Sequence, residues 1–228
     1  MTRVRRIGHK GADHIAPGNT APSFDAALAA GVDMIEFDVL PHDGRLVLAH
    51  DYEHVAEALT LEEGLAHLAS SPFTRVELDV DLKLPGYEAR VVEALRAHGL
   101  VERALVSTQY MRTLVAIREL EPGLRLGWSV PRLRRDYTTT WWLAAPAYAG
   151  LVRMRRRLPA AASGHLAAGR CDAIMAHWRL VTRRLVRMVA EAGGELYVWT
   201  VDDPTRIRAL EAMGVTGVIT NDPRLFAT

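Results

Sequence analysis

Short apolar runs alternate with longer amphipathic runs along the whole chain. Between the apolar runs, hydrophobic residues recur at the spacing of one helix face, and several of these segments end at glycine, which is common directly after a helix. Strands that alternate with helices in this way predict a parallel sheet built from βαβ units. The predicted strands cover residues 3–9, 33–39, 75–83, 104–108, 124–130, 171–177, 195–201 and 217–220.

The number of predicted strands decides between two α/β folds. Eight βα units close into a (β/α)8 TIM barrel, which commonly uses about 250 residues as one domain. We therefore predict one barrel domain over residues 1–228, with an open doubly wound sheet as the competing fold. The predicted helices cover residues 20–31, 59–68, 86–99, 111–123, 180–194 and 204–214.

Composition and charge add few constraints. The chain is 49% hydrophobic and 24% charged, as is typical of soluble globular proteins, and its net charge of +1 gives no reason to expect a nucleic-acid partner. Cys171 is the only cysteine, so we expect no intrachain disulfide and a small core residue. The basic N-terminus lacks a following apolar stretch, and the most apolar window, 141–152, is shorter than the roughly 20 residues of a membrane span. We expect a cytoplasmic protein.

One predicted strand carries two carboxylates among residues that favour burial. Side chains alternate across a strand, so Glu36 and Asp38 share one face, while Ile35 and Phe37 share the other. Two unpaired carboxylates side by side are costly to bury, because desolvation and mutual repulsion both oppose ionisation. A bound cation removes both costs. The alternative is an ion pair with arginines inside the barrel mouth.

The barrel fold predicts where further chemistry lies. Functional residues of such barrels lie at the C-terminal ends of strands and in the loops that follow. Polar and aromatic side chains occur at these places, and we expect them to converge on one rim. They include His9, Glu36, Asp38, Asp81, Lys83, Ser107, Thr108, Trp199 and Thr220.

Several separated motifs, in order, resemble the glycerophosphodiester phosphodiesterase family. They are HKG, PGNT, IEFDV, AHD, VDLK, WTVDD and GVITNDP, and they span residues 5 to 225. The resemblance implies hydrolysis of a glycerophosphodiester to an alcohol and glycerol 3-phosphate, a small-molecule reaction on a TIM barrel.

The resemblance also implies roles for individual residues. Glu36, Asp38 and Asp81 hold one divalent metal, and His9 and His50 supply general acid and base chemistry. An all-carboxylate set independently favours Mg²⁺ or Ca²⁺, with Mn²⁺ also compatible, over zinc. The residues expected to contact substrate are Lys10, Asn19, Lys83 and Trp199.

The chain departs from the family pattern in ways that leave two further functions open. Lys10 replaces an arginine, Gly18 a glutamate and Asp81 a glutamate, and these changes are the best arguments for a catalytically silent barrel that binds phosphorylated ligands or membranes. Only residues 51–58 stand where the family usually inserts a small subdomain. The near absence of that insertion predicts a more open pocket and raises a second alternative, cleavage of a lysophospholipid on its head-group side.

The long connection after the fifth strand has two interpretations. In residues 131–157, arginine clusters flank an aromatic and apolar stretch, a pattern that suits weak contact with an anionic lipid surface. The other interpretation, which we favour, is a loop followed by a barrel helix, with Trp141 and Trp142 packed inward and the arginines solvated.

Overall fold

The computed structural model describes residues 3–131 and 144–227. The strands are β1 (Arg5–Gly8), β2 (Met34–His42), β3 (Arg45–Val47), β4 (Glu77–Leu82), β5 (Ala104–Thr108), β6 (Arg125–Val130), β7 (Ala173–His177), β8 (Glu195–Trp199) and β9 (Gly217–Thr220). The helices are α1 (Ala21–Ala29), α2 (Leu61–Leu68), α3 (Glu88–Ala97), α4 (Met111–Leu120), α5 (Ala144–Ala167), α6 (Arg183–Glu191) and α7 (Pro204–Met213).

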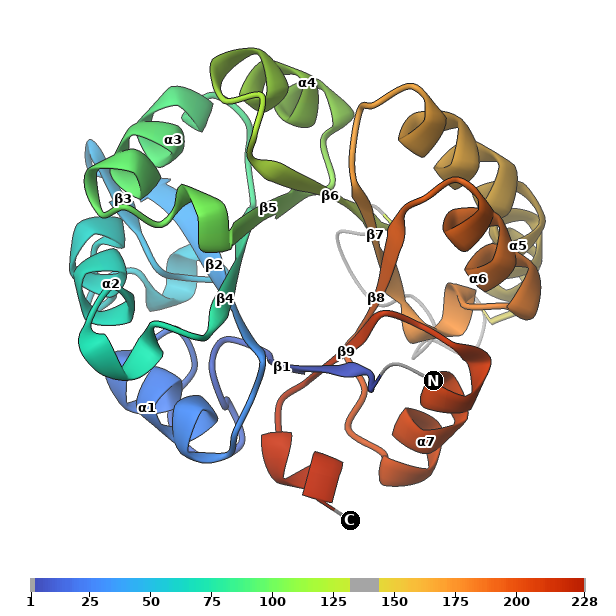
Figure 1. Cartoon of the computed structure of the whole chain (residues 1–228), viewed down its shortest axis with the longest axis horizontal. Helices are drawn as coiled ribbons and strands as arrows, with labels where there is room; N and C mark the ends of the chain where they lie inside the picture. The colour runs from blue at the N-terminus through green and yellow to red at the C-terminus, as the bar shows by residue number, and fades with distance from the viewer. Residues whose placement is uncertain (1–2, 132–143, 228) are drawn as a thin grey trace.

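Eight parallel strands close into a barrel with the helices outside (Figure 1). β1 pairs with β2 on one side and with β9 on the other, so the sheet has no free edge among these eight strands. The predicted (β/α)8 barrel is confirmed, and the open doubly wound sheet is wrong. All eight predicted strands form the barrel.

The strand β3 is an addition that the hydrophobic pattern did not predict. It pairs antiparallel with the extended end of β2 and lies outside the barrel. The residues between Asp51 and Ala58 add only the single turn of 3-10 helix Tyr52–His54 before α2 begins. The mouth of the barrel therefore has little covering structure beside β3, as predicted from the short segment 51–58.

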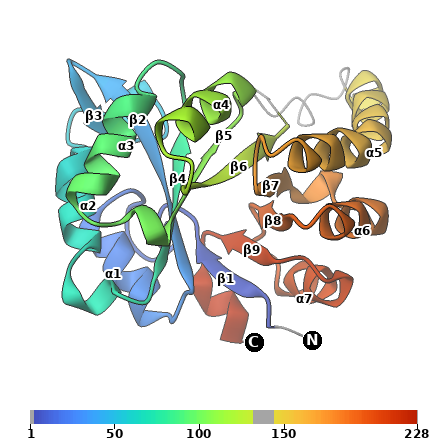
Figure 2. The ribbon, with the colours of Figure 1, turned by 45° about the horizontal axis from the view of Figure 1, so that its top comes forward.

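Two apolar layers stabilise the barrel. The helices surround the strands (Figure 2), and the continuous core between them includes Phe24, Phe37 and Leu65, each fully buried. A smaller cluster fills the interior of the barrel, where Met34 and Tyr197 meet. The interior is therefore packed with side chains and is not a pore, as in other barrels of this type.

A charged network closes the N-terminal end of the barrel. Glu77 Oε2 accepts hydrogen bonds from Arg5 at 2.8 Å and from Arg125 at 2.7 Å. Arg125 also pairs with Glu195 at 2.5 Å. Lys83 is not a partner of Glu77, because the glutamate lies at the start of β4 and Lys83 follows its end.

The long connection forms a barrel helix where the structure describes it, as predicted, and its contact with a lipid surface stays a prediction. α5 lies beside α6 (Figure 2), and Leu158 and Ala162 on its inner face are buried in the core. Trp141 and Trp142 lie outside the described residues. Within residues 3–131 and 144–227, no helix has both the length and the apolarity needed to cross a membrane.

Cys171 is buried in the core, as predicted, and burial raises the pKa of its thiol to about 12. Because the thiolate is the reactive form, a raised pKa keeps this cysteine unreactive at neutral pH. We expect iodoacetamide to leave the native protein unmodified and to alkylate Cys171 fully after denaturation, as measured by intact mass. Rapid labelling of the folded protein would contradict this packing.

Candidate functional site

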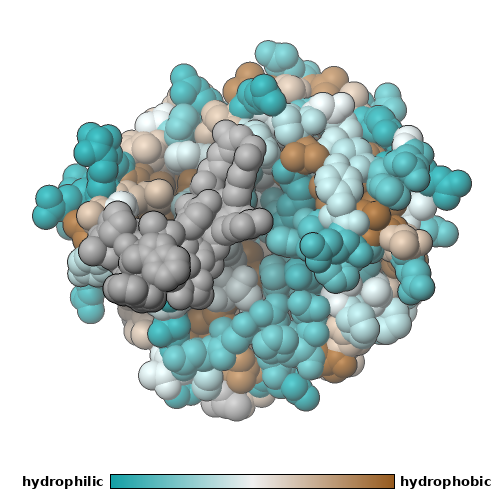
Figure 3. All heavy atoms as spheres, turned by 180° about the vertical axis from the view of Figure 1, so that it is seen from behind, coloured by the Kyte–Doolittle hydropathy of each residue, from teal (hydrophilic) through white to brown (hydrophobic). Residues whose placement is uncertain are grey.

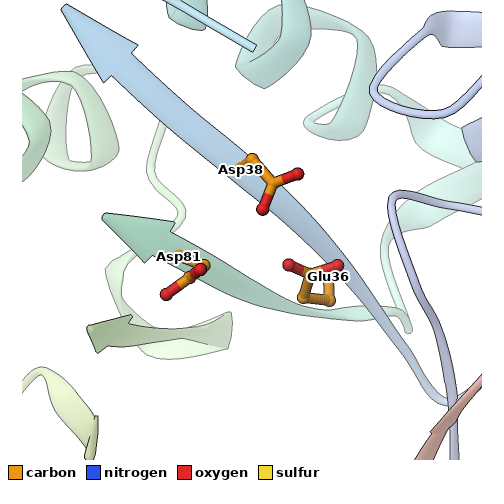
Figure 4. A group of neighbouring side chains, drawn as sticks. All are labelled: Glu36, Asp38 and Asp81. Atoms are coloured by element: carbon orange, nitrogen blue, oxygen red, sulfur yellow. The ribbon is translucent and has the colours of Figure 1, made fainter. Parts of the chain in front are cut away.

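Three carboxylates gather at the C-terminal end of two neighbouring barrel strands. Glu36 and Asp38 lie on β2, Asp81 lies on β4, and the strand register places Asp38 directly opposite Asp81. Each residue offers one oxygen within 4.8 Å of the others, and the three side chains converge (Figure 4). Glu36 is 5% exposed and Asp38 is fully buried. The carboxylates that the sequence assigned to one metal therefore meet at one point.

The loop after β1 fixes the position of Glu36. The backbone N–H of Lys10 donates to Glu36 Oε2 at 2.8 Å, and that of Gly11 donates to the Glu36 carbonyl at 3.1 Å. Gly11 has φ +86°, and a Cβ there would lie 2.6 Å from Ser23 Oγ. Only glycine fits this approach without strain. The glycine of the HKG motif thus brings the loop onto the carboxylate.

Asn19 fixes Asp38. Its side-chain Nδ2 donates to Asp38 Oδ2 at 2.9 Å, and its Oδ1 accepts from the Asp38 backbone N–H at 3.0 Å. The asparagine is 6% exposed. Its predicted contact with substrate stays a prediction, and the structure shows a positioning contact to a carboxylate.

Lys83 lies between two of the carboxylates. Its Nζ forms an ion pair with Asp38 and another with Asp81 Oδ2 at 2.5 Å. Burial opposes ionisation of Asp38, but the adjacent Lys83 charge outweighs it and holds the pKa of this carboxyl well below its usual range. Burial likewise disfavours the Lys83 ammonium, but Asp38 and Asp81 raise its pKa well above its usual value. Lysine, rather than the arginine of the alternative interpretation, neutralises Asp38.

The two other buried carboxyl groups of the site have no cationic partner of their own among the described residues, which disfavours their ionised forms. Burial, followed by repulsion from Asp38, raises the pKa of Glu36 well above its usual value. Burial and the neighbouring Asp81 raise the pKa of Asp79 to about 8, and the buried Asp79 Oδ1 has no hydrogen-bond partner among the described residues. One ammonium does not neutralise this group of acids. An oxygen-only, net-negative cluster fits a hard divalent cation such as Mg²⁺ or Ca²⁺.

A hydrogen-bonded chain orients His9. Asn221 Nδ2 donates to Asp202 Oδ2 at 2.6 Å, so the Asn221 Oδ1 faces His9 Nδ1, also at 2.6 Å. A carboxylate only accepts hydrogen bonds, which fixes the direction of the amide. Neutral His9 therefore carries its proton on Nδ1, and its Nε2 lies 3.9 Å from Glu36 Oε2. Burial lowers the pKa of His9 and favours this neutral form.

One cavity of about 240 Å³ joins the predicted groups. Figure 3 views this end of the barrel, where hydrophilic residues surround the centre of the face. His50 reaches the cavity from the loop after β3, with 54% of its side chain exposed and its Nδ1 3.4 Å from Asp51 Oδ2. The lining residues include His9, Glu36, His50, Asp79, Asp81, Lys83, Ser107 and Trp199.

Trp199 forms an apolar wall of the cavity. Its Nε1 donates to the Met175 carbonyl at 2.9 Å, and the His177 ring packs edge-on against it at 5.1 Å. This placement agrees with the predicted role beside the substrate, which remains a prediction. Trp128, on β6, packs against His165 instead of lining this cavity.

Two departures from the family pattern lie in contact with each other. A Cβ on Gly18 would lie 2.8 Å from Lys10 Cβ, so the lysine stem occupies the space beside this glycine. Lys10 Nζ points to Asp13 Oδ2 at 3.4 Å and is not among the cavity-lining residues. Its predicted contact with substrate stays a prediction.

Sequence reasoning missed the partners of His9. Asp202 follows β8 and Asn221 follows β9, both within the quoted motifs WTVDD and GVITNDP. Their position at strand ends was the available signal, because loops at this end of a barrel carry function. The pairing itself depends on the closure of β1 against β9, which the chain order does not reveal.

These features define a class of protein. A closed (β/α)8 barrel whose C-terminal mouth holds a carboxylate trio, a lysine and two histidines is a barrel enzyme with a candidate cation site. The sequence profile of the glycerophosphoryl diester phosphodiesterase family matches residues 9–95 and 75–225. The chain belongs to this family, and its predicted enzyme class, a phosphodiesterase, is confirmed.

Individual relatives agree along nearly the full length. A glycerophosphodiester phosphodiesterase of Caldanaerobacter subterraneus is 25% identical over 254 aligned residues, covering 95% of this chain and 93% of that protein. A putative glycerophosphoryl diester phosphodiesterase of Silicibacter pomeroyi has a similar crystal structure, with a TM-score of 0.79 and 23% identity over 99% of this chain and 92% of the other. A phosphodiesterase of Oleispira antarctica gives a TM-score of 0.73 at 19% identity, covering 99% and 98% of the two chains.

Proposed function

We propose that this single barrel domain, residues 1–228, hydrolyses glycerophosphodiesters to an alcohol and glycerol 3-phosphate with one divalent cation, Mg²⁺ or Ca²⁺, with Mn²⁺ as a substitute. The observation that carries the proposal is the carboxylate trio within 4.8 Å, beside a cavity that both histidines line. The Oleispira antarctica phosphodiesterase was solved in complex with the product sn-glycerol-3-phosphate, which supports the choice of product.

The trio Glu36, Asp38 and Asp81 would hold the cation, and Lys83 would share the binding of the anionic phosphate. When bound, the cation screens the substrate's negative charge and stabilises charge that develops on phosphoryl oxygens. Lys83 already lies within ion-pair distance of two members of the trio. Trp199 would pack against an apolar part of the substrate.

His9 is the proposed general base. Its proton lies on Nδ1, held by Asn221, so Nε2 has a free lone pair on the cavity side. A lowered pKa keeps this nitrogen unprotonated at neutral pH. Nε2 would accept the proton of the attacking hydroxyl group, a step worth typically about 10² to 10⁴ in rate.

His50 is the proposed general acid. It stands at the rim, half-exposed, where a departing alcohol can leave the cavity without crossing the buried carboxylates. Its protonated ring would donate to the leaving oxygen as the bond to phosphorus breaks. Asp51 Oδ2 lies 3.4 Å from His50 Nδ1, on the opposite side of the ring from Nε2.

Metal removal and restoration test the proposed reaction. We expect EDTA to abolish the release of glycerol 3-phosphate from glycerophosphocholine, and Mg²⁺, Ca²⁺ or Mn²⁺ to restore it. Product can be measured with a coupled dehydrogenase assay. If no glycerophosphodiester is cleaved with any of the three ions, the catalytically silent alternative is correct.

One observation favours a second substrate class. The half-exposed His50 and the short segment after it leave the rim without the covering subdomain expected in this family. Cleavage of lysophosphatidylcholine on the choline side would use the same groups. A turnover ratio favouring lysophosphatidylcholine over glycerophosphocholine would establish this second function.

The chain that orients His9 gives a separate prediction. Asn221→Leu removes the acceptor for His9 Nδ1, and we expect kcat to fall about 10-fold to 100-fold with little change in KM, because orientation of the base affects the chemical step. Asn221→Asp keeps an acceptor and should retain most activity. Steady-state kinetics of both variants check this. Equal losses in the two variants would contradict an orienting role.

A further inference from the structure

The helices α5 and α6 carry a concentration of positive charge that the rest of the chain balances. Residues 144–191 contain nine arginines and no lysine, and Asp172 and Glu191 are their only acidic residues, whereas the whole chain has a net charge of only +1. The charge is therefore separated in space, with the excess on one side of the barrel. In Figure 3, hydrophilic side chains project from the edge formed by α5.

Five of these arginines form what we term the α5–α6 arginine face. All five are exposed, and none has an ion pair or a side-chain hydrogen bond with another residue in the described part of the chain. Some exposed arginines elsewhere are paired, such as Arg96 with Glu121 at 2.7 Å. The arginine face consists of Arg153, Arg156, Arg157, Arg183 and Arg184.

Two of these arginines occupy positions that oppose local helix stability. Arg183 and Arg184 open the first turn of α6, and neither α5 nor α6 has an acidic residue in its first turn. The amino end of a helix carries partial positive charge and favours acids, so cations there are unfavourable in the isolated chain. An anionic partner would offset this repulsion.

The arginine face borders the mouth of the catalytic cavity. Arg155 Nε donates to the Arg179 carbonyl at 2.6 Å, which joins α5 to the 3-10 turn Trp178–Leu180. This turn follows His177, whose ring packs on Trp199 in the cavity wall. A flat anionic surface that contacts the face would therefore lie beside the mouth.

α5 also presents an aromatic group next to its arginines. Tyr148 is 66% exposed, while Leu151 and Met154 pack against the core and keep only part of their surface accessible. A helix that combines arginines with an aromatic and aliphatic residues is typical of elements that lie in the interface of a bilayer. A duplex nucleic acid would use the charge but offers no apolar phase for these side chains.

We propose that the α5–α6 arginine face binds the surface of a bilayer containing anionic phospholipids and holds the cavity mouth at that surface. Binding depends only on the described charges and side chains. Delivery of lipid-derived diesters to the cavity, in contrast, rests on the proposed function.

Vesicle co-sedimentation of the full chain tests the proposal. We expect binding to vesicles of phosphatidylcholine with one-third phosphatidylglycerol, none to phosphatidylcholine alone, and loss of binding between about 0.05 M and about 0.5 M NaCl, where screening becomes strong. The variant Arg153→Ser/Arg156→Ser/Arg157→Ser should bind the anionic vesicles roughly 100-fold more weakly.

A matched variant tests whether vesicle binding depends on this arginine face or only on the net charge of the protein. Arg45→Ser/Arg75→Ser/Arg90→Ser removes the same charge from exposed positions elsewhere and should bind like the unchanged protein. Both variants should hydrolyse soluble glycerophosphocholine at the unchanged rate. Equal weakening in the two variants, equal binding to both vesicles, or binding to RNA but not to vesicles would overturn the proposal. Vesicle binding without any phosphodiesterase activity would refute only the proposed function.

Discussion

Glu36→Gln is expected to lower kcat/KM by on the order of 10³-fold, because it removes one charged member of the carboxylate trio and with it most of the transition-state stabilisation that a bound cation provides. The change is nearly isosteric. The glutamine oxygen can still accept from the Lys10 N–H, which the native carboxylate accepts at 2.8 Å. The loss should appear in steady-state assays at saturating Mg²⁺ or Ca²⁺.

The same variant should not be less stable than the unchanged protein when metal is absent. Burial and Asp38 raise the pKa of Glu36, so its ionised form is unfavourable in the fold, and a neutral side chain relieves that cost. In EDTA we expect a Tm equal to or above that of the unchanged protein, by about 2–4 °C for each kcal/mol gained. Added cation should raise the Tm of the unchanged protein only.

Glu102→Gln, on an exposed turn at the opposite end of the barrel, is the matched control and should change neither activity nor Tm. If Glu36→Gln kept full metal-dependent activity, the trio would not be the cation site. A large fall in Tm in EDTA would instead show that Glu36 supports the fold.

The activities of the two histidine variants should depend differently on the leaving group of the substrate. His9→Gln and His50→Gln are each expected to slow glycerophosphocholine hydrolysis about 10²-fold to 10⁴-fold, the usual range for a positioned proton transfer. On the p-nitrophenyl ester of glycerol 3-phosphate the leaving anion is stable without a proton. His50→Gln should then recover most of its activity, whereas His9→Gln should not.

His54→Gln is the matched control for His50, since His54 also contacts Asp51, at 2.7 Å, but is not among the cavity-lining residues. We expect its kinetics to be unchanged on both substrates. Recovery of His9→Gln instead of His50→Gln would reverse the assigned roles. Equal recovery of activity in the two variants on the p-nitrophenyl ester would contradict the assignment of one histidine as acid and the other as base.

Periodicity predicted the barrel well, because each strand is a continuous apolar run between helical segments. It did not predict β3, whose three residues pair antiparallel with the end of β2. A run this short carries no period of its own. Its existence depends on tertiary pairing with a strand that extends three residues past the predicted end, to His42.

The pairing of Glu36 with Asp38 was predictable from local strand geometry, whereas the hydrogen-bond partners of His9 were not. Glu36 and Asp38 are two residues apart, so strand geometry alone places them on one face. The Asp202 to Asn221 to His9 chain joins segments up to 212 residues apart and requires a closed barrel. Likewise, the true partners of Glu77 come from β1 and β6, which the sequence does not place beside it.

The location of a bound ion tests the central claim most directly. Anomalous diffraction from crystals soaked in Mn²⁺ should show one strong peak whose distances to oxygens of Glu36, Asp38 and Asp81 are about 2.0–2.6 Å. An ion bound only at another place would contradict the account. So would carboxylates that remain paired with Lys83 and contact no ion.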